Sequence, residues 1–258
     1  MLVQRLLLSA VVAFALFAPN VLAHPEDEFC VPGESSLDPA LCDALAALDS
    51  SDPSRELAPI LDEEGNERGA ASTAGLYITI GIGHILPAGL DHILFVLALL
   101  LTSARLKPLV IQISTFTVAH TATLGLAAAG VISPPPYIVE PLIAATIAFV
   151  AVENLFVKKM PSWRPLLVFM FGLVHGMGFA GFFGELGLPP GQFWSALIGF
   201  NIGVEIGQLS VVVAAFLLLR FLPIDEAATR RYVVLPCSAL IGVVGLIWTV
   251  ERVLAALA

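Results

Sequence analysis

Four histidines lie within stretches that are otherwise apolar enough to cross a bilayer, namely His84, His92, His120 and His175. Asp91 and Glu205 lie at a similar depth in such stretches. An ionisable side chain in the hydrocarbon core costs a few kcal/mol, so it is retained mainly where it is buried, paired or liganded. Imidazole suits nickel, cobalt, zinc and copper, and a carboxylate extends such a site toward octahedral geometry. These six residues are therefore the candidate metal ligands. Proton relay and helix-to-helix hydrogen bonding are the other uses of the same groups.

Further polar residues accompany the six candidates. Asn201, Glu205 and Gln208 recur at helical spacing and are expected on one face of a helix. Glu153 and Asn154 fall near one end of an apolar stretch. They are supporting polar residues, and Glu153 fits either a vestibule or an interfacial position that reaches water.

The first apolar stretch carries a signal for a broken helix. On a straight helix His84 and Asp91, seven positions apart, would share a face. Between them lies Pro87-Ala88-Gly89, and proline removes a backbone donor and clashes with the preceding turn. Breaks at membrane depth are tolerated where protein or water satisfies the freed backbone groups, and transporters line binding sites with them. A break at these three residues is therefore predicted, with a structural kink as the plainer alternative.

The composition places the chain among polytopic membrane proteins. Of its 258 residues 58% are hydrophobic and 13% are charged, about half the charged fraction of a soluble domain. Thirteen of the 21 acidic residues lie between Glu26 and Glu67, so the net charge of −9 belongs mostly to one segment. No basic stripe supports nucleic-acid binding.

The N-terminal part divides into two segments. Residues 1–23 have a basic start, an apolar core and a small-residue end, which is typical of a cleaved signal peptide, although an uncleaved anchor fits the same pattern. Residues 24–73 are acidic and proline-rich and are expected to be largely disordered outside the cytoplasm. There Cys30 and Cys42 would meet an oxidising compartment, which favours a disulfide between them.

Residues 74–258 are predicted to form an all-α domain of six transmembrane helices. Each of six apolar stretches is long enough for the roughly 20 residues that a bilayer requires. They run over Ala74–Leu101, Leu109–Val131, Tyr137–Val157, Pro165–Phe183, Phe193–Leu219 and Tyr232–Ala256.

The basic residues orient these spans. Lys and Arg occupy the first, third and fifth loops, as Arg105, Lys107, Lys158, Lys159, Arg164, Arg220, Arg230 and Arg231. The second and fourth loops contain none. Because basic loops stay in the cytoplasm, both mature termini are predicted to be extracytoplasmic. Small residues at four-residue spacing, Gly172 and Gly176 in the fourth span and Gly199, Gly203 and Gly207 in the fifth, predict that these two helices pack together. The glycine faces fit homo-oligomers and internal packing equally well.

The order of the motifs resembles one family. His-x-x-Pro-x-Gly-x-Asp-His (84–92), Phe-Thr-x-Ala-His-Thr-x-Thr-Leu (116–124), Val-Glu (139–140) with Glu-Asn-Leu (153–155), Phe-Gly-x-x-His-Gly-x-Gly-Phe-Ala (171–180) and Phe-Asn-x-Gly-Val-Glu-x-Gly-Gln (200–208) are similar to those of the HupE/UreJ family. The resemblance implies a bacterial six-span inner-membrane protein linked to nickel supply for hydrogenase or urease. It also implies that His84, Asp91 and His92 are the first candidates for metal binding.

The leading hypothesis is a secondary transporter or facilitator of a divalent transition metal, nickel or cobalt first and zinc or copper next. The acidic segment would concentrate cations outside. The sequence contains no Walker A motif, so it gives no sign of ATP-driven transport. Histidine must be neutral to bind a metal, so uptake should weaken as the pH falls toward the usual histidine pKa of about 6.5.

Two other functions remain open. An intramembrane metal-dependent hydrolase could use three histidines and Asp91 to hold a zinc ion, with Glu205 as the base. A non-transporting metal-delivery or assembly protein could chelate copper or nickel through His24, the first residue after signal cleavage, and act with metalloenzyme maturation partners.

Overall fold

The structure, a computed structural model, describes residues 69–87, 89–102, 106–157, 160–178, 191–221 and 225–257. The predicted signal peptide, nearly all of the acidic segment, and Cys30 and Cys42 lie outside the described residues. Ala88 and the loop residues Arg105, Lys158 and Lys159 also lie outside them. Every regular element in the described part of the chain is helical.

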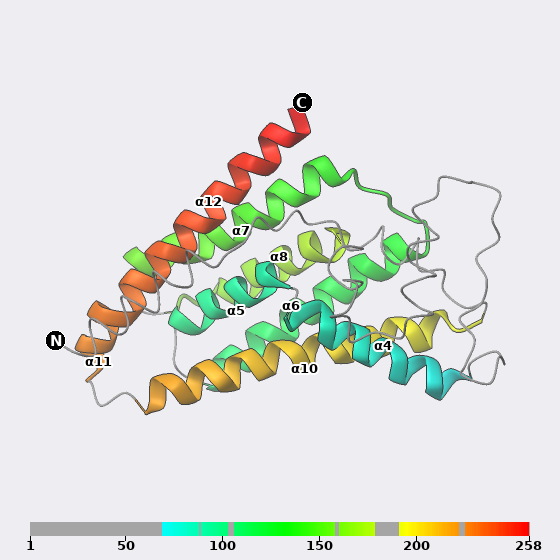
Figure 1. Ribbon diagram of the computed structural model, residues 1–258, viewed down its shortest axis with the longest axis horizontal. Helices are drawn as coiled ribbons and strands as arrows, with labels where there is room; N and C mark the ends of the chain where they lie inside the picture. Colours follow the sequence, from blue (N-terminus) through cyan, green and yellow to red (C-terminus); the bar gives the residue numbers. More distant parts are fainter. Residues whose placement is uncertain are drawn as a thin grey trace, which may run out of the picture.

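The membrane body consists of the following helices, shown in Figure 1: α4 (Ala70–Ile85), α5 (Leu90–Thr102), α6 (Leu106–Ala128), α7 (Pro136–Phe156), α8 (Arg164–Gly178), α10 (Phe193–Arg220), the short α11 (Glu226–Thr229) and α12 (Leu235–Leu257). A π-helical stretch over Arg230–Val234 joins α11 to α12.

Four of these helical stretches are long and apolar enough to span a bilayer, namely α6, α7, α10 and the stretch Ala227–Leu257. The pair α4 and α5 makes a fifth candidate span, with a bend of 70° between its halves. The helix therefore breaks where Pro87 and Gly89 predicted, because α4 ends at Ile85 and α5 begins at Leu90. The described part of the fourth predicted span, α8, has 15 residues and is shorter than a full span. An all-helical membrane protein is thus confirmed, with up to five spans in the described residues.

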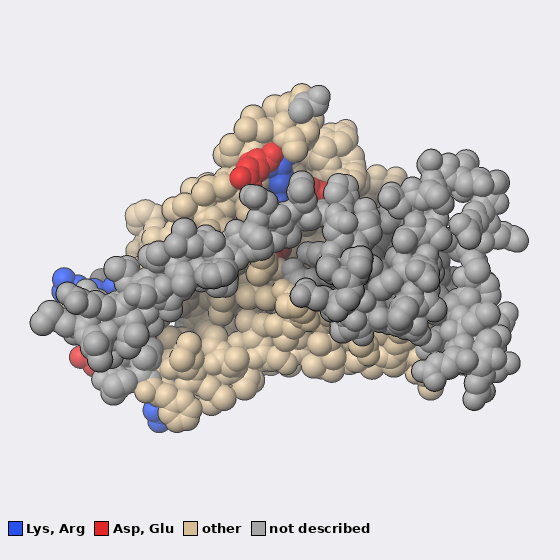
Figure 2. All heavy atoms as spheres, in the orientation of Figure 1, with Lys and Arg blue, Asp and Glu red and all other residues tan. Residues whose placement is uncertain are grey.

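The surface of the body suits lipid. Large apolar side chains remain exposed along the middle of the spans, including Val118 at 64% and Ile206 at 43% exposure. On the face in Figure 2 the visible charged side chains gather mainly near α11 and the end of α10, and near the upper edge beside α12. Charge at the ends and apolar groups between them are what a bilayer-embedded body requires.

The helices associate chiefly as three pairs, which lie side by side in Figure 1: α4 with α10, α7 with α12, and α6 with α8. The sequence predicted that the glycine-rich faces of α8 and α10 would pack against each other, and this is wrong. Gly176 of α8 instead lies against the backbone of α6 at His120, and Gly203 of α10 against the backbone of α4 at Ile78. The small residues do mark close helix contacts, but with other partners.

The α4–α10 contact gives a test of this packing. A Cβ at Gly203 would lie 2.2 Å from the Ile78 carbonyl oxygen, so Gly203→Ala is expected to push the two helices apart. Overpacking of this kind costs about 1–3 kcal/mol of folding free energy, which a lowered melting temperature in detergent would report. Gly75→Ala on α4 is the matched control, because a Cβ there has no neighbour within 4 Å. Equal melting temperatures for the two variants would contradict the close contact.

A candidate metal centre of buried histidines

The break between α4 and α5 brings two histidine rings close together in an edge-on arrangement. His84 is in the last turn of α4, and His92 is in the first turn of α5. Their ring centroids lie 4.8 Å apart. Gly89 makes this geometry possible, since a Cβ there would lie 2.2 Å from the His84 carbonyl oxygen. A straight helix would have aligned His84 with Asp91, so the break changes which residue faces His84.

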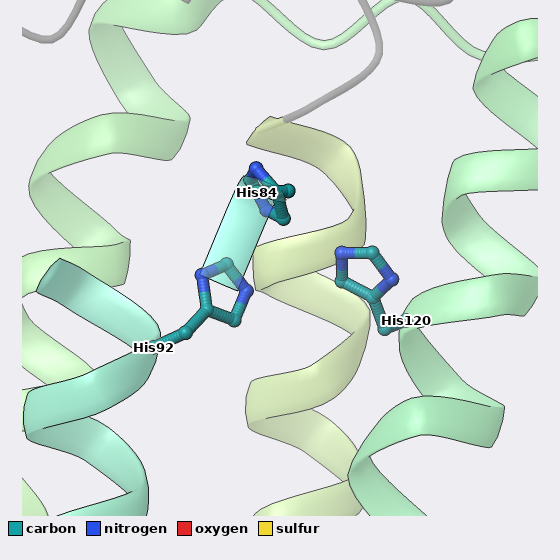
Figure 3. A group of neighbouring side chains, drawn as sticks. All are labelled: His84, His92 and His120. Atoms are coloured by element: carbon teal, nitrogen blue, oxygen red, sulfur yellow. The ribbon is translucent and has the colours of Figure 1, made fainter. Parts of the chain in front are cut away.

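His120 joins this pair from the middle of α6. One ring nitrogen from each of His84, His92 and His120 lies within 4.8 Å of the other two, and all three residues are buried. Figure 3 shows the three side chains converging from three different helices. Two nitrogens bound to one ion at 2.0–2.1 Å are at most ~4.2 Å apart, so small side-chain rotations would complete a shared site. We call these three residues the histidine cluster.

His175 of α8 lies beside the histidine cluster but outside the group of three. Its ring centroid is 5.2 Å from that of His92. Its Nε2 lies 2.8 Å from the Thr146 hydroxyl on α7, and its Nδ1 is buried without a hydrogen-bond partner among the described residues. The hydrogen bond to Thr146 fixes the orientation of the ring, as supporting partners do for metal-ligating histidines. His175 is therefore placed either as a fourth ligand or as a supporting residue.

Aromatic side chains surround the histidine cluster. The Phe116 ring lies 5.9 Å from His92 and 5.1 Å from His175, and the Phe200 ring lies 5.6 Å from His84. Phe116 and Phe200 are themselves fully buried. The imidazoles are therefore held in a packed, dehydrated environment, in which electrostatic interactions are stronger than in water.

The three polar residues of α10 share one face, as their spacing predicted. The structure shows that this face contacts α6 and continues away from the histidine cluster. Asn201 pairs with His120 through an Oδ1–Nδ1 contact of 3.2 Å, which sets the orientation of that ring. Glu205 accepts a hydrogen bond from Ser114 at 2.8 Å and another from Thr117. Gln208 Oε1 lies 3.2 Å from the Thr117 hydroxyl. The structure does not group Glu205 with the three histidines, and whether it binds metal stays a prediction.

Asp91 is engaged by a residue that the sequence analysis missed. Both carboxylate oxygens of Asp91 accept hydrogen bonds from Arg252 of α12, at 3.0 to 3.3 Å. Asp91 therefore lies beside His92 in sequence but is paired with a guanidinium. An arginine within the last apolar stretch was the signal for this pair, since a charge at that depth requires a partner.

Glu153 and Asn154 form a second buried network. Glu153 makes a 3.0 Å ion pair with Arg164, whose side chain is 0% exposed. Asn154 donates to the Ala98 carbonyl oxygen at 2.8 Å and accepts a hydrogen bond from Thr102. Glu153 is thus neither solvated nor part of the histidine cluster, and Arg164 lies inside the body although the sequence placed it in a cytoplasmic loop.

Comparison with known protein families gives a match over most of the chain. The family described as HupE / UreJ protein matches residues 62–252, which include every helix that contributes to the histidine cluster. Neither the curated proteins nor the solved structures contain a match to the chain. The family match covers most of the chain and includes all the motifs that suggested the resemblance, and the chain therefore belongs to the HupE/UreJ family.

Proposed function

We propose that the protein is a secondary transporter or facilitator that carries a divalent transition metal, nickel or cobalt, across a bacterial inner membrane. The observation that supports this most strongly is the histidine cluster, three buried imidazoles from three helices with ring nitrogens within 4.8 Å of one another. Family membership is consistent with a role linked to nickel or cobalt. A metal ion is the ligand that best accounts for imidazoles gathered at one point inside an apolar body.

The broken span supports movement of the ion as well as binding. Transporters place discontinuous helices at their substrate sites, where half-helix ends and freed backbone groups bind the ion while one bundle of helices moves against another. Here the two halves of the broken span each supply one histidine, His84 from α4 and His92 from α5. A change in the 70° bend between α4 and α5 would therefore change the distance between two ligands.

The proposed organisation around this site follows the charge pattern. Residues 1–23 act as a cleaved signal peptide, residues 24–73 as an acidic segment outside the cytoplasm, and residues 74–258 as a six-span domain. Both mature termini are then extracytoplasmic, and Cys30 and Cys42 form a disulfide. The match to the HupE / UreJ family from residue 62 onward supports the assignment of the later part of the chain to one membrane domain.

The test measures metal content and flux together on purified protein in proteoliposomes. Wild-type protein is expected to move Ni²⁺ or Co²⁺, and His92→Ala and Asp91→Asn are both expected to abolish that flux. The first variant removes a ligand and the second removes the charge beside it. Tight, stoichiometric metal without flux in the wild type would contradict transport and favour a metal-dependent hydrolase or a metal-delivery protein.

A further inference from the structure

Two ion pairs contact helix α7 near its two ends, and these contacts show where the pairs lie relative to the histidine cluster. Near its start, the Glu140 carbonyl oxygen accepts a hydrogen bond from Arg252 at 3.1 Å. Near its end, Glu153 pairs with Arg164. At 1.5 Å per residue these two points are about 20 Å apart along the helix. Thr146, the partner of His175, lies about halfway between them. The Asp91–Arg252 and Glu153–Arg164 pairs therefore lie on opposite sides of the histidines.

The pair nearer the start of α7 is partly exposed. The Arg252 and Asp91 side chains keep 16% and 23% of their surface exposed. The bidentate hydrogen bonds join the first turn of α5 to the last span, one residue before His92. Separation of this pair would free the first turn of α5, and with it one side of the histidine cluster.

The pair nearer the end of α7 is buried. The Arg164 and Glu153 side chains are 0% and 7% exposed. Within the described part of the chain, neither Glu153 oxygen nor Arg164 Nη1 forms a well-directed hydrogen bond, so the charges are held mainly by their attraction across 3.0 Å. The neighbouring Asn154 links this end of α7 to α5 through the Ala98 carbonyl and to Ser238 of α12 at 3.4 Å. Separation of this pair would free the start of α8 from this end of α7.

Charge balance gives an ion a means to separate the first pair. The histidine cluster offers neutral ligands, so a divalent ion brings two positive charges into an apolar body without a carboxylate in the group. A divalent cation near Asp91 competes with the guanidinium for the carboxylate, and it carries twice the charge. Because the Asp91–Arg252 pair is partly exposed, a released Arg252 side chain can be solvated, whereas Arg164 has no such outlet.

From these positions we infer that the two ion pairs are the two closures of the metal route. Asp91–Arg252 closes the side from which the ion enters, and Glu153–Arg164 closes the opposite, cytoplasmic side. This rests on the proposed transport function and orientation, but the closures can be tested without any metal flux. Neither arginine contacts the metal in this scheme, and each acts by holding a carboxylate.

The experiment measures the accessibility of a thiol between the two pairs. Thr146→Cys is introduced into the full chain after Cys30, Cys42 and Cys237 are replaced by serine. Membrane vesicles of both orientations are treated with a charged, membrane-impermeant methanethiosulfonate reagent. Arg252→Gln is expected to raise the labelling rate from the extracytoplasmic side only, by about tenfold, because the rate follows the open fraction. The neutral double variant Glu153→Gln/Arg164→Met is expected to raise labelling from the cytoplasmic side only.

The variant Arg252→Lys keeps the test decisive if Arg252→Gln fails to fold. Lysine keeps the charge but cannot form the bidentate bond, so an intermediate labelling rate from the extracytoplasmic side is expected. Labelling that is unchanged in both neutralised variants, or raised from the same side in both, would overturn the two closures. Ni²⁺ flux, measured on the full chain with Thr146, Arg252, Glu153 and Arg164 all unchanged, tests the transport function separately. If each variant raised labelling from its own side but no Ni²⁺ flux were found, the two closures would stand and the transport function would be rejected.

Discussion

Replacing His120 by alanine is expected to lower the affinity of the purified protein for Ni²⁺ by more than about 100-fold, beyond the 10- to 100-fold that loss of a supporting residue costs. His120 supplies one of the three buried ring nitrogens of the histidine cluster, and its orientation is set by Asn201. Loss of one of three ligands leaves a site that cannot hold the ion against water. Equilibrium dialysis gives the affinity, and the absorption spectrum of bound Co²⁺ reports whether nitrogen ligands are lost.

Two further variants make this result specific. Val118→Ala is the control, because Val118 is on the same helix as His120 but is 64% exposed. The affinity of this variant for Ni²⁺ should not change. His175→Ala is expected to lower affinity by about 10- to 100-fold, because His175 borders the cluster and its Nε2 is already engaged by Thr146. A loss as large as that of His120→Ala would make His175 a fourth ligand. Unchanged affinity in His120→Ala would contradict the candidate site as a whole.

The sequence predicted the depth of the histidines and the break that brings two of them together. Both inferences rest on local physics, since a charge in an apolar span needs a partner and proline interrupts a helix. Asp91 shows the limit of such reasoning. Its seven-residue spacing from His84 has meaning on a straight helix, whereas the 70° bend directs His92 to His84 and leaves Asp91 to pair with Arg252.

Helix neighbours could not be predicted from the sequence. In lipid, apolar side chains on any face are tolerated, so periodicity does not identify the buried face or its partner. The glycines of α10 correctly marked a close contact, but only the tertiary structure shows that Gly203 meets α4 rather than α8. Arg164 was misplaced for a similar reason. A basic residue near a span end usually reaches water, and here Glu153 on another helix holds it inside.

The buried Glu153–Arg164 pair is expected to have the largest effect on stability of any pair described here. Arg164→Met removes one partner and leaves the Glu153 carboxylate in a dry environment, where its side chain is 7% exposed. Breaking a buried ion pair from one side costs about 3–5 kcal/mol, because the remaining charge is uncompensated. Arg164→Met should therefore unfold at a much lower temperature than wild type in detergent, or fail to accumulate in the membrane.

The double variant Glu153→Gln/Arg164→Met separates this charge effect from lost packing. It removes both charges, and replacing a buried ion pair by neutral groups of similar volume is often close to neutral for stability. Most of the lost stability should therefore return. The remaining deficit measures the contacts that the Arg164 Nη2 makes with Asn154 at 3.5 Å, together with its packing at the start of α8. If the double variant were as unstable as Arg164→Met, the arginine would act through packing rather than charge. The Glu153–Arg164 pair could then not serve as a closure that opens by charge separation.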